Sequence, residues 1–338
     1  MGKYVIRAAA GLALLTVVCA GAGCAGPSKQ EKDKGTLRIG VLLYREDDTF
    51  IGTLKEALEK QARSYEQDSG VKVTMDILDA KGSQNTQANQ ADRLISLDCD
   101  ALCVNIVNRF ASSVVIDKAM AADTPVVFFN REPVEEDLKR WEKLYYVGVD
   151  AKETAVLQGQ ILVDAYQADP SSLDRNGDGK VSYVLLEGET SHQDSLIRTE
   201  WSIETVKKGG VPLEKLTGGI ANWERSQASA LMEQWLEEYG GQVELVICNN
   251  DDMALGALDA MERKGILPGA VKLVGIDGIP AGKKAVEEGK LLGTVECDKD
   301  LYAKAIFDMA LSLSGAKGAG ELPESHYYWC PQSAVVKR

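Results

Sequence analysis

Apolar residues recur in two alternating patterns along most of this 338-residue chain. Short, nearly continuous apolar runs are typical of strands buried on both faces, and apolar residues spaced three or four apart are typical of helices. The runs predict strands at 38–44, 71–77, 101–107, 125–130 and 145–150, and again at 181–188, 243–249, 271–278 and 291–298. The helical spacing predicts helices at 51–66, 84–97, 111–121, 151–167, 194–208, 226–238, 251–264 and 299–314.

This alternation predicts an α/β protein with two doubly wound lobes, because parallel strands need helices on both faces of their sheet. Ligands bind such sheets at the carboxyl ends of the strands. Six polar residues fall at predicted strand ends: Asp47, Asp48, Asn130, Asn249, Asn250 and Asp277. Asn and Asp also favour turns, which explains any one of them better than all six. We therefore expect a binding site in the cleft between the lobes.

The amino-acid composition argues against several classes of protein. The formal net charge is −13 and the chain has only two histidines. An acidic chain is a poor partner for nucleic acid, and a His-rich metal site is not expected. No glycine-rich phosphate loop follows the first strand, and no basic helix-turn-helix precedes it. These absences favour a ligand-binding protein over a nucleotide enzyme or a repressor.

The N-terminus reads as an export signal. Lys3 and Arg7 precede an apolar run and a zone of small residues, so residues 1–23 are predicted to be a signal peptide. Cys24 and a polar linker over 24–35 are typical of a lipidated tether, although Gly21 stands where Leu is usual. The alternative is an ordinary secretory signal with an incidental cysteine. Five further cysteines are expected to be buried thiols.

Residues 174–182, DRNGDGKVS, match the spacing of an EF-hand calcium loop. The ligands would be the side chains of Asp174, Asn176, Asp178 and Ser182 and the backbone carbonyl of Lys180. Leu185 occupies the position of the usual bidentate Glu, so the loop needs a carboxylate from elsewhere in the chain. The alternative is an Asx-rich turn without a metal.

Several motifs occur together in one order: RIGVLLYREDDTF, TPVVFFNREP, YYVGVDAKET, the DxNxDG loop, ICNNDDMALGA and GIDGIP. From about Thr36 to about Leu313 the chain therefore resembles the periplasmic galactose/glucose-binding proteins of bacterial sugar importers. The resemblance implies the type I periplasmic-binding fold, with two Rossmann-like lobes joined by a three-strand hinge. It places 36–149 and 297–330 in the first lobe, and 150–296 and 331–338 in the second.

The resemblance also implies the sugar contacts. They are Asp48, Phe50 and Asn130 from the first lobe and His192, Asp194, Arg198, Trp223, Asn250 and Asp277 from the second, with Phe50 and Trp223 on the two faces of the ring. It further implies Glu244 as the missing calcium ligand. Carboxylate and Arg groups give strong hydrogen bonds to hydroxyls, and aromatic rings pack on the apolar face of a sugar.

Structural roles compete with some of these assignments. Asp48 could belong only to an acidic turn, and Phe50 could be a core residue. Trp223 could be a lone surface aromatic, and His192 could merely begin a helix. His192 and Asp194 could also suggest acid–base catalysis, but no nucleophile or metal site accompanies them.

Two residues depart from the family. Ser182 stands where the family has Gln as a calcium ligand. Cys297 stands where the family has an Asn that contacts the sugar, so we expect weaker binding of glucose or galactose, or a different preferred sugar. A Cys297→Asn substitution is expected to improve hexose binding.

The sequence thus predicts a monomeric, exported lipoprotein on the outer face of the cytoplasmic membrane, or in the periplasm. It would bind a galactose- or glucose-like sugar, with structural Ca²⁺, and deliver it to ABC permease subunits without catalysing a reaction. The alternative is a sugar-sensing co-receptor for a chemoreceptor or sensor kinase. A glycoside-modifying enzyme would need paired carboxylates across a scissile bond.

Overall fold

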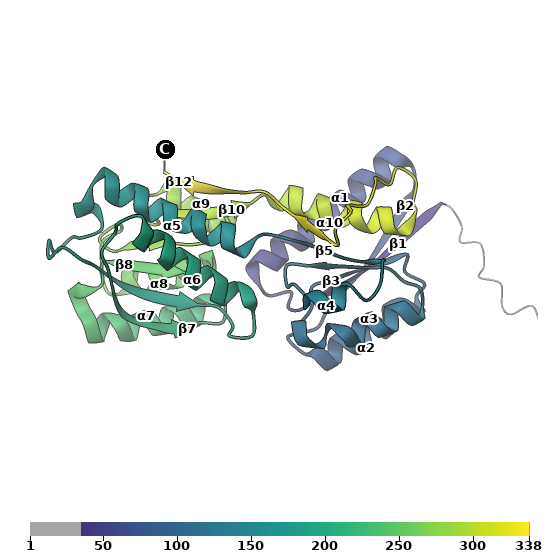
Figure 1. Cartoon of the computed structure of the whole chain (residues 1–338), viewed down its shortest axis with the longest axis horizontal. Coiled ribbons are helices and arrows are strands. Elements are labelled where there is room, and N and C mark those ends of the chain that lie inside the picture. The colour runs from purple at the N-terminus through teal and green to yellow at the C-terminus, as the bar shows by residue number, and fades with distance from the viewer. Residues whose placement is uncertain (1–34, 338) are drawn as a thin grey trace, which may run out of the picture. The chain divides into compact units, whose positions relative to one another are not determined.

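The computed structural model describes residues 35–337 (Figure 1). The predicted signal peptide, Cys24 and all of the predicted linker but its last residue lie outside the described residues. Between residues 35 and 337, no helix is both long enough and apolar enough to span a bilayer.

The first sheet is parallel throughout, with the strand order β11-β5-β4-β3-β1-β2. Its strands are β1 (Thr36–Leu43), β2 (Lys72–Asp79), β3 (Ala101–Val104), β4 (Val126–Phe129), β5 (Leu144–Gly148) and β11 (Tyr327–Trp329). One face packs against α1 (Thr49–Ser69) and α10 (Lys299–Ser314), and the other against α2 (Gln84–Ser96) and α3 (Ser112–Ala121). A short helix, α4 (Glu135–Leu138), precedes β5. Burial on both faces explains the continuous apolar runs of the central strands.

The second sheet has the order β12-β10-β9-β8-β6-β7 and is parallel except for the antiparallel pair β10–β12. Its strands are β6 (Val181–Glu187), β7 (Leu213–Ile220), β8 (Leu245–Cys248), β9 (Lys272–Val274), β10 (Gly293–Cys297) and β12 (Gln332–Val336). One face carries α5 (Ala151–Ala168) and α6 (Gln193–Lys208), and the other α7 (Arg225–Tyr239), α8 (Asp251–Arg263) and α9 (Pro280–Glu287). The predicted architecture of two α/β lobes is therefore confirmed.

The chain passes between the lobes three times. β5 is followed by α5, β10 by α10, and β11 by β12, and each step changes sheets. The first and third passages are hydrogen-bonded, because Gln332 Nε2 donates to Asp150 O at 3.0 Å. These passages form the three-strand hinge that the resemblance implies.

The sequence prediction missed β7, α4, α9, β11 and β12. β7 is an edge strand whose residues, LEKLTGGI, are mostly exposed or half-buried, so it lacks a continuous apolar run. β11 and β12 are likewise edge strands with mostly exposed or half-buried residues. The helices α4 and α9 have four and eight residues, which gives too few repeats for a helical periodicity to emerge.

Candidate functional site

A pocket between the lobes is lined by residues that follow the strands of both sheets. Its volume, including the part open to solvent, is about 370 Å³. Nine of the ten residues implied as sugar contacts line it: Asp48, Phe50, Asn130, His192, Asp194, Arg198, Trp223, Asn250 and Asp277. The sites at the strand ends of the two lobes thus form one pocket, as expected for doubly wound sheets.

Asp48 and Phe50 lie at the start of α1. Asp48 caps this helix, since its Oδ1 accepts a hydrogen bond from Ile51 N at 3.0 Å, and its Oδ2 accepts one from the Tyr44 hydroxyl. A carboxylate oxygen has two lone pairs, so capping does not exhaust its capacity. Phe50 is half-buried and packs against the cores of both lobes. Asp48 therefore has its structural role in a turn and Phe50 its role in the core, and both residues also line the pocket.

Asn130 follows β4 with a left-handed backbone, φ 61°. Its N–H donates to the Tyr302 hydroxyl at 2.9 Å, and its carbonyl accepts from the Tyr146 hydroxyl at 3.0 Å. Its side-chain Oδ1 accepts from Asn105 Nδ2 at 3.0 Å. These bonds fix the side chain and leave its Nδ2 group to donate into the pocket.

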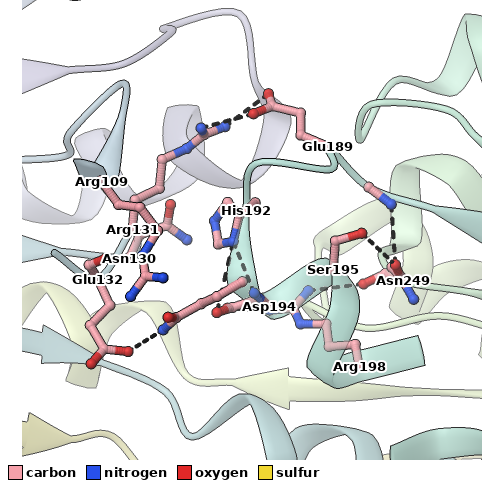
Figure 2. A network of polar contacts seen from close by, with 12 residues as sticks. Arg109, Asn130, Arg131, Glu132, Glu189, His192, Asp194, Ser195, Arg198 and Asn249 are labelled. Carbon is pink, nitrogen blue, oxygen red and sulfur yellow. Dashed lines mark hydrogen bonds and ion pairs between the residues drawn. The ribbon is translucent and has the colours of Figure 1, made fainter. Parts of the chain in front are cut away.

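The N-terminal part of α6 carries His192 at its cap, Asp194 in its first turn and Arg198 in its second (Figure 2). His192 caps the helix, because its Nδ1 accepts from Asp194 N at 3.2 Å. Burial, with a smaller contribution from nearby Arg131 and Arg198, holds the pKa of His192 well below its usual range. The ring is therefore neutral with its proton on Nε2, which makes it a hydrogen-bond donor.

Arg198 connects two carboxylates of the pocket. Its Nη2 lies 3.6 Å from Asp194 Oδ2, and its Nη1 lies 3.5 Å from Asp277 Oδ1 and donates to Asn249 O at 2.9 Å. Its Nε is buried and has no hydrogen-bond partner in the described part of the chain. A buried donor without a partner is costly, so a ligand oxygen at this atom would be favourable.

Burial dominates the electrostatics of these carboxylates. It raises the pKa of Asp194 to about 6, although Arg198 opposes the shift. Burial likewise raises the pKa of Asp277 well above its usual range, again against the effect of Arg198. Both groups are thus poorly compensated by protein alone, which is typical of functional sites.

The indole of Trp223 forms an apolar wall of the pocket. It meets the His192 ring edge-on at a centroid distance of 5.3 Å, and the Arg198 guanidinium lies 5.7 Å from its centroid. A Cβ added at Gly188 would lie 2.1 Å from the indole, so only glycine permits this position. Asn250 caps α8 through Met253 N and donates to the Trp223 carbonyl at 3.3 Å.

Three of the seven described non-glycine residues with positive φ line the pocket. Asn130, Trp223 and Asp277 have φ values of 61°, 68° and 112°. Non-glycine residues rarely adopt such values, and they persist where the surrounding structure imposes them. The surrounding structure therefore fixes the backbone of three residues that line the pocket.

Sequence reasoning missed Tyr44, Arg131 and Glu189. Arg131 and Glu189 join the lobes through two hydrogen bonds of 2.9 Å (Figure 2). The Arg131 guanidinium also lies 3.7 Å from the centroid of the Tyr44 ring. A second ion pair, between Arg45 and Glu224 at 2.8 Å, also joins the lobes. The only signal in the sequence was the position of Arg131 directly after Asn130, since pairing across lobes depends on the tertiary fold.

Cys297 lies beside the pocket that the other nine predicted residues line. It ends β10 and lines two neighbouring cavities, one of which it shares with Asn130, Arg198 and Asp277. The structure thus places this thiol at the hinge, beside the pocket rather than in its lining.

The loop at residues 174–182 lies against Glu244, a buried residue that precedes β8. Glu244 Oε1 accepts from Arg175 N at 2.8 Å and from Asn176 N at 3.0 Å, and Oε2 accepts from Ser182 N at 2.9 Å. Glycine is required at the sixth loop position, because Gly179 has φ 86°. Glu244, which the resemblance implies as the remote calcium ligand, is therefore adjacent to the loop.

The loop oxygens are hydrogen-bonded within the loop. Asp174 accepts from Gly177 N and Gly179 N, and Asp178 accepts from Lys180 N. Across residues 35–337, no three His, Cys, Asp or Glu side chains are gathered closely enough to hold a metal. The oxygen donors suit a hard cation, but they would have to turn from their amide partners to bind one.

Two α/β lobes around a polar pocket define a ligand-binding protein, and the comparisons agree. A family model described as a periplasmic binding protein domain matches residues 39–318. The chain is 35% identical to the D-galactose/methyl-galactoside binding periplasmic protein MglB of Haemophilus influenzae, over 84% of this chain and 83% of that protein. It is 29% identical to a xylitol-binding protein of Mycolicibacterium smegmatis, over 85% and 73%.

Solved structures show the same architecture. An ABC transporter solute binding protein of Bacillus halodurans with bound myo-inositol matches with a TM-score of 0.73 at 26% identity, over 90% of this chain and 96% of that one. The chain belongs to the periplasmic binding protein family. It is therefore a substrate-binding component of transport that works outside the cytoplasm, and not an enzyme.

Proposed function

We propose that this chain binds a monosaccharide of the galactose or glucose type in the pocket and delivers it to the permease subunits of an ABC importer. The observation that carries the proposal is the meeting, in one pocket, of charged and amide groups with the indole of Trp223. A pyranose has the matching surface, because its hydroxyls donate and accept while one of its faces is apolar. The relative named for D-galactose supports the choice of sugar.

Each lobe supplies a different set of groups. Asp48 and the Asn130 amide would bind hydroxyls from the first lobe, with Phe50 against the ring. Asp194 and Asp277 would accept from hydroxyls on the second lobe, while Arg198 and the neutral His192 would donate. The buried Nε atoms of Arg131 and Arg198 have no hydrogen-bond partner among residues 35–337, and these two donors suit hydroxyl oxygens.

Binding and closure would be coupled, because a sugar that contacts both lobes favours the state in which they meet. The ion pairs Arg131–Glu189 and Arg45–Glu224 stabilise the same state. A permease that recognises this closed state would receive only loaded protein. No step requires covalent chemistry.

The sugar assignment is tested by melting the protein with D-galactose, D-glucose, D-ribose, xylitol and myo-inositol in turn. A specific ligand stabilises by mass action, so galactose or glucose is expected to raise the melting temperature most. Asn130→Ala is expected to remove most of this shift, and Asn108→Ala, an exposed control, is expected to keep it. If no sugar raises the melting temperature, the proposal is wrong.

We also propose that Asp174, Asn176, Asp178, Ser182, Glu244 and the Lys180 carbonyl hold a structural Ca²⁺. The adjacency of buried Glu244 to the loop supports this, and Lys180 Nζ pairs with Glu214 at 3.0 Å, so its charge is neutralised. A chelator should lower the melting temperature, and Ca²⁺ should restore it better than Mg²⁺, which prefers a tighter octahedral site. An unchanged melting curve in metal-free buffer would contradict the proposal.

For the N-terminus, we propose lipidation at Cys24, which the sequence motif supports. Cells fed an alkyne fatty acid should label the wild-type protein and not Cys24→Ser. Equal labelling of both would contradict it.

A further inference from the structure

Two buried cysteines lie on two of the three passages between the lobes. Cys297 ends β10, just before the chain passes to α10, and Cys330 lies between β11 and β12. Their exposed fractions are 8% and 2%, and both belong to the same core cluster. The Cys330 side chain acts directly on the Cys297 thiol, so the two thiols are close neighbours.

Strand register accounts for this contact. In the antiparallel pair β10–β12, Cys297 is opposite Gln332, two residues after Cys330. Cys330 lies only two residues before Gln332, so this pairing brings Cys330 close to Cys297 at the end of β10. Cys330 N also donates to Gly148 O at 2.7 Å, which fixes its backbone against the first passage.

The other described cysteines are distributed differently. Cys99 and Cys248 belong to two other core clusters, while Cys103 shares the cluster of the hinge pair. Cys99 and Cys103 lie four residues apart around β3 and interact electrostatically, but they pack in different core clusters. The geometry therefore favours Cys297 and Cys330 as the partners of any intramolecular bond.

We propose that Cys297 and Cys330 are a redox pair that closes to a disulfide in an oxidising compartment and ties two hinge passages together. In the reaction each thiol loses its hydrogen and one S–S bond forms. Two electrons and two protons pass to a disulfide of the glutathione type, which becomes two thiols. Such exchange proceeds through a mixed disulfide and requires a thiolate.

The burial of Cys297 and Cys330 determines at which stage the disulfide can form. The neighbouring Cys330 side chain, followed by burial, raises the pKa of the Cys297 thiol. The folded, reduced pair is therefore a poor nucleophile. We expect the disulfide to form while the exported chain folds and to resist reduction afterwards.

The disulfide would restrict the hinge. Opening of the lobes requires backbone rotations at the passages, and a covalent link between two of them limits these rotations. Cys297 also lines a cavity with Asn130 and Asp277 of the proposed sugar site. Oxidation should therefore slow both uptake and release of the bound sugar several-fold and raise the melting temperature.

In the experiment, the protein is unfolded and reduced, and it is then refolded in a glutathione redox buffer. Remaining thiols are alkylated and the peptides are mapped by mass spectrometry. We expect the loss of two thiols and a peptide linked through Cys297 and Cys330. Cys330→Ser should keep all its remaining thiols, and Cys103→Ser, the control from the same core cluster, should still form the link.

Retention of every thiol in the refolded wild-type protein would overturn the proposal, and so would a link between other cysteines. The wild-type map decides the question even where a variant fails to fold. It requires no sugar, so its failure is distinct from a failure of the proposed function.

Discussion

Asp194→Asn is expected to stabilise the ligand-free protein while weakening sugar binding. Burial raises the pKa of this carboxyl from 3.8 to about 6, so the folded state disfavours its charge. Above pH 6 the folded chain carries the full penalty, which disappears as the pH falls toward 4 because the folded state binds the proton first. A shift of about two units corresponds to up to about 3 kcal/mol of stability at neutral pH.

The amide removes the charge with little change of shape, although Arg198 loses one of its two carboxylate neighbours. The net gain should therefore be on the order of 1–3 kcal/mol, or a few degrees in melting temperature. Sugar affinity should fall by about 1.5–3 kcal/mol, or roughly 10- to 150-fold, because a charge-assisted hydrogen bond is lost.

The assay is urea denaturation of the ligand-free protein at about pH 4.5 and about pH 7.5, with Asp164→Asn as an exposed control. The stabilisation by Asp194→Asn should be larger at the higher pH, and the control should change neither value. Asp251, whose pKa burial raises to about 7, gives the wild type a further loss of stability with rising pH, which both variants retain. A destabilised Asp194→Asn at neutral pH would refute the argument that burial outweighs Arg198.

Further predictions concern packing, metal and closure. Gly188→Ala should displace Trp223 and weaken sugar binding by about 1–3 kcal/mol by calorimetry, whereas Gly241→Ala, where the added Cβ has no neighbour within 4 Å, should not. Glu244→Gln should remove most of the melting-temperature shift produced by Ca²⁺, and an undiminished shift would place the metal elsewhere. Arg131→Met removes an ion pair between the lobes, so it should weaken sugar affinity by about 1–3 kcal/mol and speed sugar release, as measured by stopped flow. Unchanged release kinetics would show that this ion pair has no part in closure.

The sequence was most informative where a pattern repeats. The central strands of both sheets are buried on both faces, so their continuous apolar runs predicted them. β7 was not predicted because it is a mostly exposed edge strand. Without β7, there was no reason in the sequence to place Trp223 after the carboxyl end of a strand. Burial pattern, rather than propensity, separated the strands that were predicted from those that were missed.

At the site, the sequence predicted which residues line the pocket better than it predicted which residues they contact. Asp48 and His192 are helix caps and also pocket residues, so the structural and functional alternatives were not exclusive. The bond between Arg131 and Glu189 joins residues 58 positions apart on different lobes, so no local sequence pattern predicts it. The contact of Cys297 with Cys330 likewise depends on the register of β10 and β12.

The most direct test of the central claim is a calorimetric titration of D-galactose and D-glucose into the wild type, Trp223→Ala and Asp277→Asn. We predict one sugar bound per wild-type chain. We further predict a loss of about 2–4 kcal/mol in binding free energy for Trp223→Ala, which removes the apolar wall, and a clear loss for Asp277→Asn. Absence of binding in the wild type, or equal affinity in all three proteins, would contradict a sugar site between the lobes.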